Sequence, residues 1–338
     1  MNSEIHEQIR QLFQSANNFL LVSHIRPDGD AVGSVLGLGL ALQEAGKTVQ
    51  MILADGTPSS FRHLPGAAQI KRKVHDGFEV AIVLDASDIQ RIGGVLGERV
   101  PDLNVDHHIT NLNFARINLV EPDVEATCSI LAESLPAWGL QISEPVAKAL
   151  LTGVVSDTIG FRTSNVRSHT LRLAADLMDK GADLSELYNR ALIRRSYEAA
   201  RFWGQGLERL ERQDRLVWTT LTLSDRQKSS YPGNDDADLV NLLSSIDDSD
   251  ICIIFVEQKN NHVKVSWRAQ NGYDVSQLAL AFGGGGHPAA SGADIPGTLE
   301  EIQEKVLAAT RQYIQQEQAK KNDKIAQDVI MVTEGEKK

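Results

Sequence analysis

The sequence contains little cysteine, few aromatic residues and fewer basic than acidic side chains. Its only two cysteines, Cys128 and Cys252, lie in apolar segments, which favours buried thiols in a reducing compartment over a disulfide. The formal net charge is -11. This charge argues against broad electrostatic binding to duplex nucleic acid. It still allows an anionic substrate that metal ions and a few basic groups would hold locally.

Long hydrophobic runs are also missing. No apolar segment approaches the ~18 residues that a membrane-spanning helix needs, and the polar residues 1–10 lack the apolar region of a signal peptide. We therefore expect a cytoplasmic protein that contacts no membrane. The four tryptophans are spaced too widely to form a stacking platform for single strands. With 338 residues, 42% of them hydrophobic, the chain can bury a sizeable core and suggests about two domains.

Hydrophobic periodicity predicts an α/β fold with a doubly wound, mainly parallel sheet in the first part of the chain. Short apolar runs predict strands at 19–22, 48–53, 80–84 and 103–105. The run at 80–84 is apolar throughout, as in a strand that is buried on both faces of a parallel sheet. Helices are expected at 5–13, 31–45, 126–135, 143–158, 168–180 and 184–194.

The pattern changes after a polar helix that is expected at 197–212. Beyond it, strands at 216–223, 251–256 and 262–268 and helices at 238–246, 275–282 and 299–313 predict a smaller α/β domain. We accordingly predict a first domain at 1–195, a linker helix at 196–213 and a second domain at 214–316. The Lys-, Glu- and Gln-rich segment 317–338 is expected to be a disordered tail.

Acidic and imidazole side chains follow three of the predicted strands. The strand at 19–22 runs into a polar loop, and the strands at 80–84 and 103–105 end directly at polar residues. The side chains concerned are His24, Asp28, Asp30, Asp85, Asp106, His107 and His108. Ligands of open α/β sheets bind at the carboxyl ends of the strands. We therefore expect these side chains to lie at one edge of the sheet.

Asp157 ends a predicted helix, where the helix dipole destabilises a carboxylate and a nearby cation would be needed. If it joins Asp28, Asp30 and Asp85, four carboxylates meet, and each like-charge pair ~4 Å apart costs about 4 kcal/mol at an effective dielectric of ~20. Two divalent ions would cancel the four charges and support phosphoester hydrolysis. The mixture of imidazole and carboxylate favours Mn²⁺, with Co²⁺, Fe²⁺ or Zn²⁺ as alternatives.

Each of these segments also has an ordinary structural interpretation. The segment from Asp28 to Asp30 could be a turn, Asp85 could cap a helix, and His24 could be a satisfied polar residue. Asp88 and Arg91 are interpreted as a local salt bridge. The occurrence of acidic residues at four strand or helix ends favours the metal site over these separate explanations.

A second candidate site follows the helix expected at 275–282. It contains four consecutive glycines, Gly283, Gly284, Gly285 and Gly286. Glycine readily adopts positive φ, so successive backbone amides could form a nest for an anion. His287 could then donate a proton to a phosphate, and Arg268 could provide a charge-assisted pair of hydrogen bonds. The alternative is a flexible linker beside a surface arginine.

These motifs resemble those of the DHH phosphoesterase family. The resemblance covers residues 17–315 and rests on His24-x-x-x-Asp28-x-Asp30, Asp85, Asp106-His107-His108 and Asp157-Thr158. The glycine run, preceded by Asp274-Val275-Ser276, is similar to a DHHA1 domain. Among members of the family, the chain is most similar to the NrnA-like group of bifunctional oligoribonucleases and pAp phosphatases.

The resemblance implies hydrolysis of short oligoribonucleotides (nanoRNA) or 3′-phosphoadenosine 5′-phosphate (pAp) with two Mn²⁺ per site, or with Co²⁺ or Mg²⁺ instead. One ion would be bound by His24 and Asp28, and the other by Asp30, His107 and Asp157. Asp85 would bind both. Asp106 would support the imidazole of His107, and His108 would face the substrate. Arg268, His287 and the four glycines would bind a nucleotide phosphate.

Other activities remain open at this point. The same architecture would suit a phosphodiesterase for c-di-AMP or for the linear dinucleotides pApA and pGpG, and a non-enzymatic nucleotide-binding module is the alternative outside enzymes. A manganese-type inorganic pyrophosphatase and a processive exonuclease are less favoured. The expected partner is a short RNA or nucleotide, and because dimers occur in similar proteins, the resemblance also favours a homodimer.

One motif departs from the family pattern. Its usual continuation is Asp-Thr-Gly-x-Phe, whereas this chain reads Asp157-Thr158-Ile159-Gly160-Phe161. The glycine has moved by one position, which could alter how the base is held.

Overall fold

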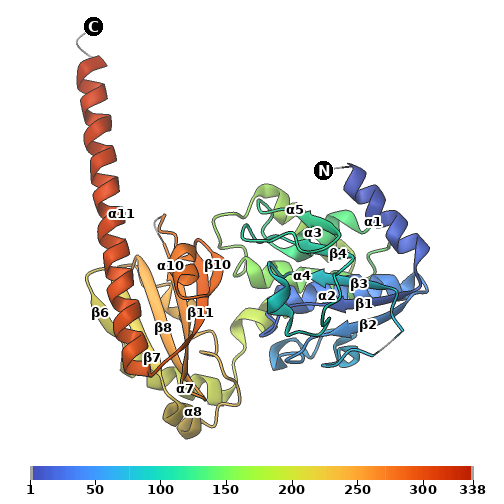
Figure 1. The fold of residues 1–338 in the computed structure, drawn as a ribbon, viewed down its shortest axis with the longest axis horizontal. Coiled ribbons are helices and arrows are strands. Elements are labelled where there is room, and N and C mark those ends of the chain that lie inside the picture. Colours follow the sequence, from blue (N-terminus) through green and yellow to red (C-terminus); the bar gives the residue numbers. More distant parts are fainter. Residues whose placement is uncertain (1–2, 76, 271, 336–338) are drawn as a thin grey trace. The chain divides into compact units, whose positions relative to one another are not determined.

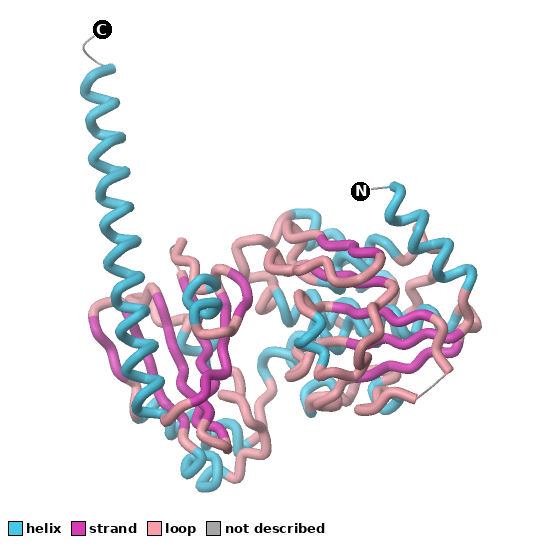
Figure 2. Tube along the Cα trace, viewed as in Figure 1, coloured by secondary structure: helices cyan, strands magenta, loops and turns pink. Residues whose placement is uncertain are grey.

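A computed structural model describes residues 3–75, 77–270 and 272–335 of the chain, and the side chains as far as Lys320. The chain forms two compact units, with the boundary after Arg194. Within the described ranges, no helix combines the length and the apolar composition that are needed to cross a membrane. Figures 1 and 2 show that each unit has its own sheet and its own covering helices.

Unit 1 is built on a five-stranded parallel sheet with the order β2-β1-β3-β4-β5. Its strands are β1 Asn18–Val22, β2 Thr48–Ile52, β3 Val80–Leu84, β4 Leu103–Asp106 and β5 Ile117–Val120. The chain passes from β1 to β2 on one side and then returns to β3 on the other side of β1. The point where the strand order reverses, between β1 and β3, is where open α/β sheets bind ligands.

Helices bury one face of this sheet, and short turns and loops cover the other. The helical segments are α1 Ser3–Ser15, α2 Gly29–Glu44, α3 Thr127–Ser134, α4 Glu144–Asp157, α5 Ser168–Asp179 and α6 Leu184–Tyr188, with the 3-10 turns η1 Ser59–Phe61, η2 Ala67–Gln69 and η3 Ile89–Ile92 and the π-helical turn η4 Asn189–Ile193. Leu21 contributes to the core on the helical face, whereas Leu20 and Val22 contribute to the opposite core. The continuous apolar strands therefore have both faces buried.

Glycines in α2 allow its close approach to both neighbours. A Cβ atom at Gly33 would lie 2.6 Å from the carbonyl oxygen of Ala149 in α4, and one at Gly39 would collide with Met51 of β2. This close packing places the first turn of α2 and the last turn of α4 at the same edge of the sheet.

Unit 2 contains a six-stranded mixed sheet with the order β10-β11-β9-β8-β7-β6. Its strands are β6 Glu211–Gln213, β7 Leu216–Leu221, β8 Ile251–Gln258, β9 His262–Ala269, β10 Gly285–His287 and β11 Ala290–Pro296. Its helices are α7 Tyr197–Glu208, α8 Leu223–Ser229, α9 Leu239–Leu243, α10 Ser276–Ala281 and α11 Leu299–Gly335. The β8–β9 hairpin turns at Asn260 and Asn261, whose φ angles of 61° and 58° suit the expected tight turn.

Alternating side chains of this sheet build two separate cores. Cys252 and Ile254 of β8 pack with α7 and α9, whereas Ile253 and Phe255 pack on the face that carries α10 and α11. The alternation follows from the two-residue period of a strand. The same alternation places each residue of this sheet on one of these two faces.

Three predicted segments differ from the structure. The helix predicted at 197–212 ends at Glu208, because Glu211–Gln213 pair with β7 instead. Its residues Ala199 and Phe202 are buried in the core of unit 2. The helix predicted at 238–246 spans only Leu239–Leu243.

The third difference concerns the segment from 317, which we predicted to be a disordered tail. Helix α11 continues to Gly335, and residues 336–338 lie outside the described part of the chain. No glycine or proline interrupts the sequence between Gly297 and Gly335. The intervening residues are rich in Ala, Gln, Glu and Lys, which have high helix propensity.

Candidate active site

Side chains from all of the predicted motifs of unit 1 meet at the carboxyl edge of its sheet. His24, Asp85 and His107 follow β1, β3 and β4, respectively. Asp30 belongs to the first turn of α2, and Asp157 is the last residue of α4. Asp30, Asp85 and His107 are almost completely buried. Segments far apart in the sequence therefore build a single polar centre below the surface.

His24 and Asp85, together with Asp28 at the N-cap of α2, form a first cluster. The Nε2 atom of His24 lies 3.4 Å from Oδ2 of Asp85 and 3.8 Å from Oδ1 of Asp28. Their ligand atoms all lie within 4.8 Å of one another, a spacing that could hold a metal ion.

A second cluster, formed by Asp30, Asp85 and His107, has the same spacing and shares Asp85 with the first. The Nε2 atom of His107 lies 3.7 Å from Oδ1 of Asp85 and 3.9 Å from Oδ2 of Asp30. It is also 3.4 Å from Oδ2 of Asp157. Each cluster thus uses a different oxygen of the Asp85 carboxylate.

Both imidazoles present Nε2 to the carboxylates because Nδ1 is already engaged. The Nδ1 atom of His24 lies 2.8 Å from the carbonyl oxygen of Ile25, and that of His107 lies 3.2 Å from the carbonyl oxygen of Val124. A carbonyl oxygen only accepts hydrogen bonds, so these contacts require the proton on Nδ1. The Nε2 lone pair of the neutral ring is then directed at the clusters, as in a metal-binding histidine.

The buried carboxylates of the centre need positive charge beside them. Burial, together with the neighbouring carboxylates, raises the pKa values of Asp30 and Asp157 well above the ordinary range. Burial alone would lower the pKa of His24, but Asp28 and Asp85 outweigh it and raise that pKa to about 10. Without a metal, protons would therefore partly compensate the carboxylates. The residues present fit divalent metal binding, which would compensate the same charges.

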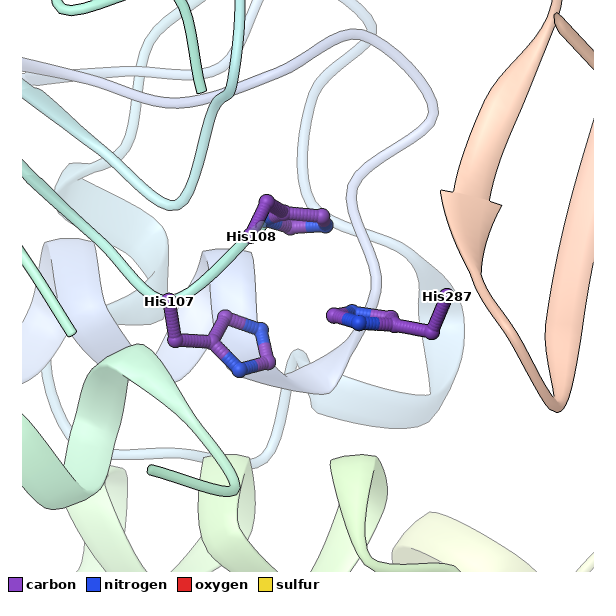
Figure 3. A group of neighbouring side chains, drawn as sticks. All are labelled: His107, His108 and His287. Carbon is purple, nitrogen blue, oxygen red and sulfur yellow. The ribbon is translucent and has the colours of Figure 1, made fainter. Parts of the chain in front are cut away.

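Within the Asp106-His107-His108 triplet, Asp106 supports His108 and not His107 as we predicted. Oδ1 of Asp106 lies 2.7 Å from Nδ1 of His108, and Oδ2 accepts a hydrogen bond of 2.6 Å from the side-chain amide of Asn111. Residues two apart in an extended chain project to the same side, whereas the intervening residue projects to the other. The rings of His107 and His108 have centroids 4.8 Å apart and an interplanar angle of 67° (Figure 3).

The sequence predicts the helix at 126–135, but it does not reveal that the first residues of α3 contact the carboxylates of the site. Backbone amides of Thr127 and Cys128 donate to Oδ2 and Oδ1 of Asp30, at 2.7 and 2.9 Å. The hydroxyl of Thr127 also donates to Oδ1 of Asp85, at 3.2 Å. The N-cap position of α3 is Ala126, which has no capping side chain. The usual local signal of a helix start is therefore lacking, and the group that caps the helix comes from a distant segment.

Left-handed backbone conformations surround the centre. Asp85 has φ of 54°, and Ile159, Gly160 and Phe161 follow Asp157 with φ of 49°, 70° and 65°. A β-branched residue such as Ile159 rarely adopts this conformation. The shifted glycine of the fourth motif therefore leaves isoleucine at a backbone position that glycine would occupy without strain.

In unit 2, Arg268 and His287 flank a common neighbour. Ala290 of β11 pairs directly with Arg268 of β9 and with His287 of β10. Directly opposed residues of antiparallel strands project from the same face. Because Arg268 also pairs with Cys252, this face is the one that carries α9. Nε of Arg268 donates to Oδ1 of Asn241 in α9 at 3.2 Å, which orients the guanidinium.

The four glycines do not form the open nest that we predicted. The amides of Gly283 and Gly284 donate to Leu280 and Ala279 and so end α10. Residues Gly285–His287 form strand β10, which pairs with β11. A Cβ atom at Gly284 would collide with the carbonyl oxygen of Gly292. Close packing against β11 therefore explains why residue 284 is a glycine.

The Asp88–Arg91 salt bridge that we expected is not among the ion pairs of the described residues. The carboxylate of Asp88 instead accepts the amide of Gln90 at 3.0 Å and caps η3.

Comparisons with known proteins agree with this architecture. Residues 18–154 match the family description "DHH family, N-terminal domain", and residues 225–316 match "DHHA1 domain". The chain is 33% identical to the bifunctional oligoribonuclease and PAP phosphatase NrnA of Thermus thermophilus, over 87% of this chain and 89% of that protein. It is 30% identical to the NrnA of Mycoplasma genitalium, over 82% and 89%, respectively.

A solved structure, that of an exopolyphosphatase-related protein from Bacteroides fragilis, matches with a TM-score of 0.82 and 25% identity, covering 93% of this chain and 96% of that one. The fold and the matched domains define a two-domain phosphoesterase. The chain belongs to the DHH family and carries a DHHA1 domain.

Proposed function

We propose that the chain is a Mn²⁺-dependent phosphoesterase that hydrolyses short oligoribonucleotides and pAp. The observation that carries this proposal is the position of Asp85, whose two carboxylate oxygens face two separate His/Asp clusters. A shared carboxylate between two clusters suits a pair of divalent ions. The names of the two NrnA relatives support the substrate class.

The residues of unit 1 divide between the two metal positions. His24 and Asp28 would hold one ion, Asp30, His107 and Asp157 the other, and Asp85 both. Bound there, the ions would polarise the phosphate and lower the pKa of a water molecule. The mixed imidazole and carboxylate ligands favour Mn²⁺, with Co²⁺ or Mg²⁺ as alternatives.

His108 is assigned to the substrate. Asp106 holds its Nδ1 atom and, against the effect of burial, raises the pKa of the imidazole. A protonated His108 can donate a hydrogen bond to a phosphate oxygen and a proton to the leaving group. Asn111, which donates to the same carboxylate, keeps Asp106 in place.

Unit 2 is assigned to phosphate binding, with unit 1 as the catalytic domain. Arg268 and His287 lie on one face of the sheet on either side of Ala290, whose small side chain separates them. A guanidinium and an imidazole in this arrangement can donate several hydrogen bonds to one phosphate group. Gly285 and Gly286, in the edge strand β10, would contribute backbone contacts.

The test is a Mn²⁺-dependent time course on 5′-labelled RNA of increasing length, from the dinucleotide upward, with pAp and c-di-AMP assayed in parallel. We expect turnover of the shortest RNAs and of pAp, and its loss in Asp85→Asn. The matched control is Asp88→Asn, which removes a carboxylate outside both clusters. Full activity of Asp85→Asn would overturn the two-metal assignment, and preferred turnover of c-di-AMP would overturn the substrate assignment.

A further inference from the structure

Thr127 contacts two buried carboxylates of the active site, those of Asp30 and Asp85. It is the first residue of α3, and none of its surface is exposed. Its amide donates to Asp30, and its hydroxyl donates to Oδ1 of Asp85 at 3.2 Å. Neither interaction belongs to the histidine and aspartate motifs that define the two clusters.

We propose that Thr127 is a positioning residue, whose hydroxyl holds the Asp85 carboxylate in the orientation that gives each metal position one oxygen. This inference rests on the two-metal arrangement proposed above. Thr127 is not one of the proposed metal ligands, so this role is separate from theirs.

The orientation of the Asp85 carboxylate needs such a support. Oδ2 faces His24 at 3.4 Å, and Oδ1 faces His107 at 3.7 Å, so a rotation about the last side-chain bond would misplace both oxygens. That bond joins an sp³ to an sp² carbon, and its torsion has a broad distribution without sharp minima. The side-chain rotamer therefore does not define the carboxylate plane, and hydrogen bonds to its oxygens must.

The backbone at Asp85 gives a second reason. Its φ of 54° is a left-handed conformation, which costs of order 1–3 kcal/mol and persists where the surroundings impose it. The amide of Asp85 is bound to the carbonyl oxygen of Val105 at 2.9 Å. The main chain is thus fixed by β4, and the side chain is fixed by α3 through Thr127.

The two contacts of Thr127 can be separated by mutation. The amide bonds from Thr127 and Cys128 to Asp30 come from the backbone and survive any side-chain change that preserves α3. Thr127→Val has nearly the same shape and replaces the hydroxyl with a methyl group. Thr127→Ser keeps the hydroxyl and removes a methyl group. A role in packing would therefore be more sensitive to serine, and a role in positioning Asp85 would be more sensitive to valine.

The hydroxyl bonds to the oxygen that faces His107, so its loss should weaken mainly the metal position formed with Asp30, His107 and Asp157. Mutation of groups that orient metal ligands typically costs about 10- to 100-fold in metal affinity. We expect a loss of that size for the Mn²⁺ ion at this position in Thr127→Val and less than about 3-fold in Thr127→Ser.

The experiment titrates the full-length, metal-free chain with Mn²⁺ and follows binding by calorimetry and by the electron paramagnetic resonance of coupled ion pairs. The control is Thr152→Val, since Thr152 is equally buried and its hydroxyl donates to the carbonyl oxygen of Lys148 at 2.7 Å. Circular dichroism and melting in EDTA establish that each variant is folded.

Selective loss of one ion and of the coupled signal in Thr127→Val, with Thr127→Ser and Thr152→Val close to wild type, is the expected result. Wild-type affinity for both ions in folded Thr127→Val would overturn the role of Thr127 and leave the proposed function intact. Equal losses in the serine and valine variants would also overturn it. Failure of the wild-type chain to bind two ions would instead overturn the two-metal proposal itself, and this inference with it.

Discussion

Nε2 of His107 lies 3.4 Å from Oδ2 of Asp157 and joins the end of strand β4 to the end of helix α4. Neither β4 nor α4 alone brings the two side chains together. Glycines of α2 let α4 pack closely enough for its last residue to reach the edge of the sheet. The contact brings a carboxylate at the negative end of a helix dipole into an acidic cluster, an arrangement that is unfavourable without a cation.

Asp157→Asn should therefore stabilise the metal-free protein while weakening metal binding. Removing an anion from a helix C-terminus contributes about 0.3–1 kcal/mol, and the raised pKa of Asp157 shows that the ionised form is disfavoured there. Thermal melts in EDTA and in excess Mn²⁺ would measure both effects. A variant less stable than wild type in EDTA would contradict this account of the centre.

The stability of the metal-free protein should fall as the pH rises above neutrality. The pKa of His24 is raised from 6.5 to about 10 in the folded state. Its contribution is therefore fully present below pH 6.5 and is lost as the pH rises toward 10. The raised pKa values of Asp30 and Asp157 act in the same direction from pH 3.8 upward. Melting temperatures in EDTA across this range would test the sign.

His24→Gln provides the comparison for this pH dependence, because it removes the group that titrates between pH 6.5 and about 10. The melting temperature of the variant in EDTA should therefore fall less steeply with pH in that interval. Saturating Mn²⁺ should reverse the trend for the wild type, since metal binding competes with protons at the same ligands. An unchanged slope in His24→Gln would show that other groups produce it.

Asp106→Asn should shift the pH profile of hydrolysis and leave substrate binding nearly unchanged. Asp106 raises the pKa of His108 by its contact at 2.7 Å. If His108 acts as an acid, loss of the carboxylate lowers that pKa, and activity should decline at a lower pH than in the wild type. We expect kcat to fall about 10- to 100-fold, as is typical when a supporting group is lost. A rise in KM with an unchanged kcat profile would refute this role.

Gly160→Ala should destabilise unit 1 more than the same change at Gly46. Both glycines have positive φ, 70° and 81°, so both variants carry the conformational cost of alanine in this region. A Cβ atom at Gly160 would also collide with the ring of Tyr188, whereas one at Gly46 meets no described atom within 4 Å. The difference in unfolding free energy should be about 1–3 kcal/mol, the usual cost of overpacking. Equal effects of the two changes would exclude the clash with Tyr188.

Arg268→Lys should raise KM for phosphorylated substrates with little change in kcat. Lysine retains the charge but lacks the planar fork of hydrogen-bond donors. Losing a hydrogen bond to a charged group costs about 1.5–3 kcal/mol, so KM should rise about 10- to 100-fold. The control is Arg215→Lys, because Arg215 pairs with Asp250 at 2.8 Å elsewhere in unit 2. A fall in kcat with an unchanged KM would contradict a role in substrate binding.

The fold and the residues of the site were predictable to different extents. Apolar runs located four of the five strands of unit 1, all except β5. The polar residues at strand ends indicated which side chains would meet. The partner of Asp106 was not predictable in the same way, because it depends on the side to which successive residues project beyond β4. We predicted an anion-binding nest at the glycines from 283, because the local sequence does not reveal that β10 pairs with β11.

The sequence by itself determined the chemical inventory, the class of fold and most elements of unit 1, since residue type and hydrophobic periodicity are local properties. Tertiary structure alone decided that Asp85 serves two clusters and that Asp30 caps α3 through amides 97 and 98 positions away. Contacts of this kind depend on the register of parallel strands and on the close packing of α2 against α4. No short stretch of the chain encodes them, because they are set by segments that meet only after folding.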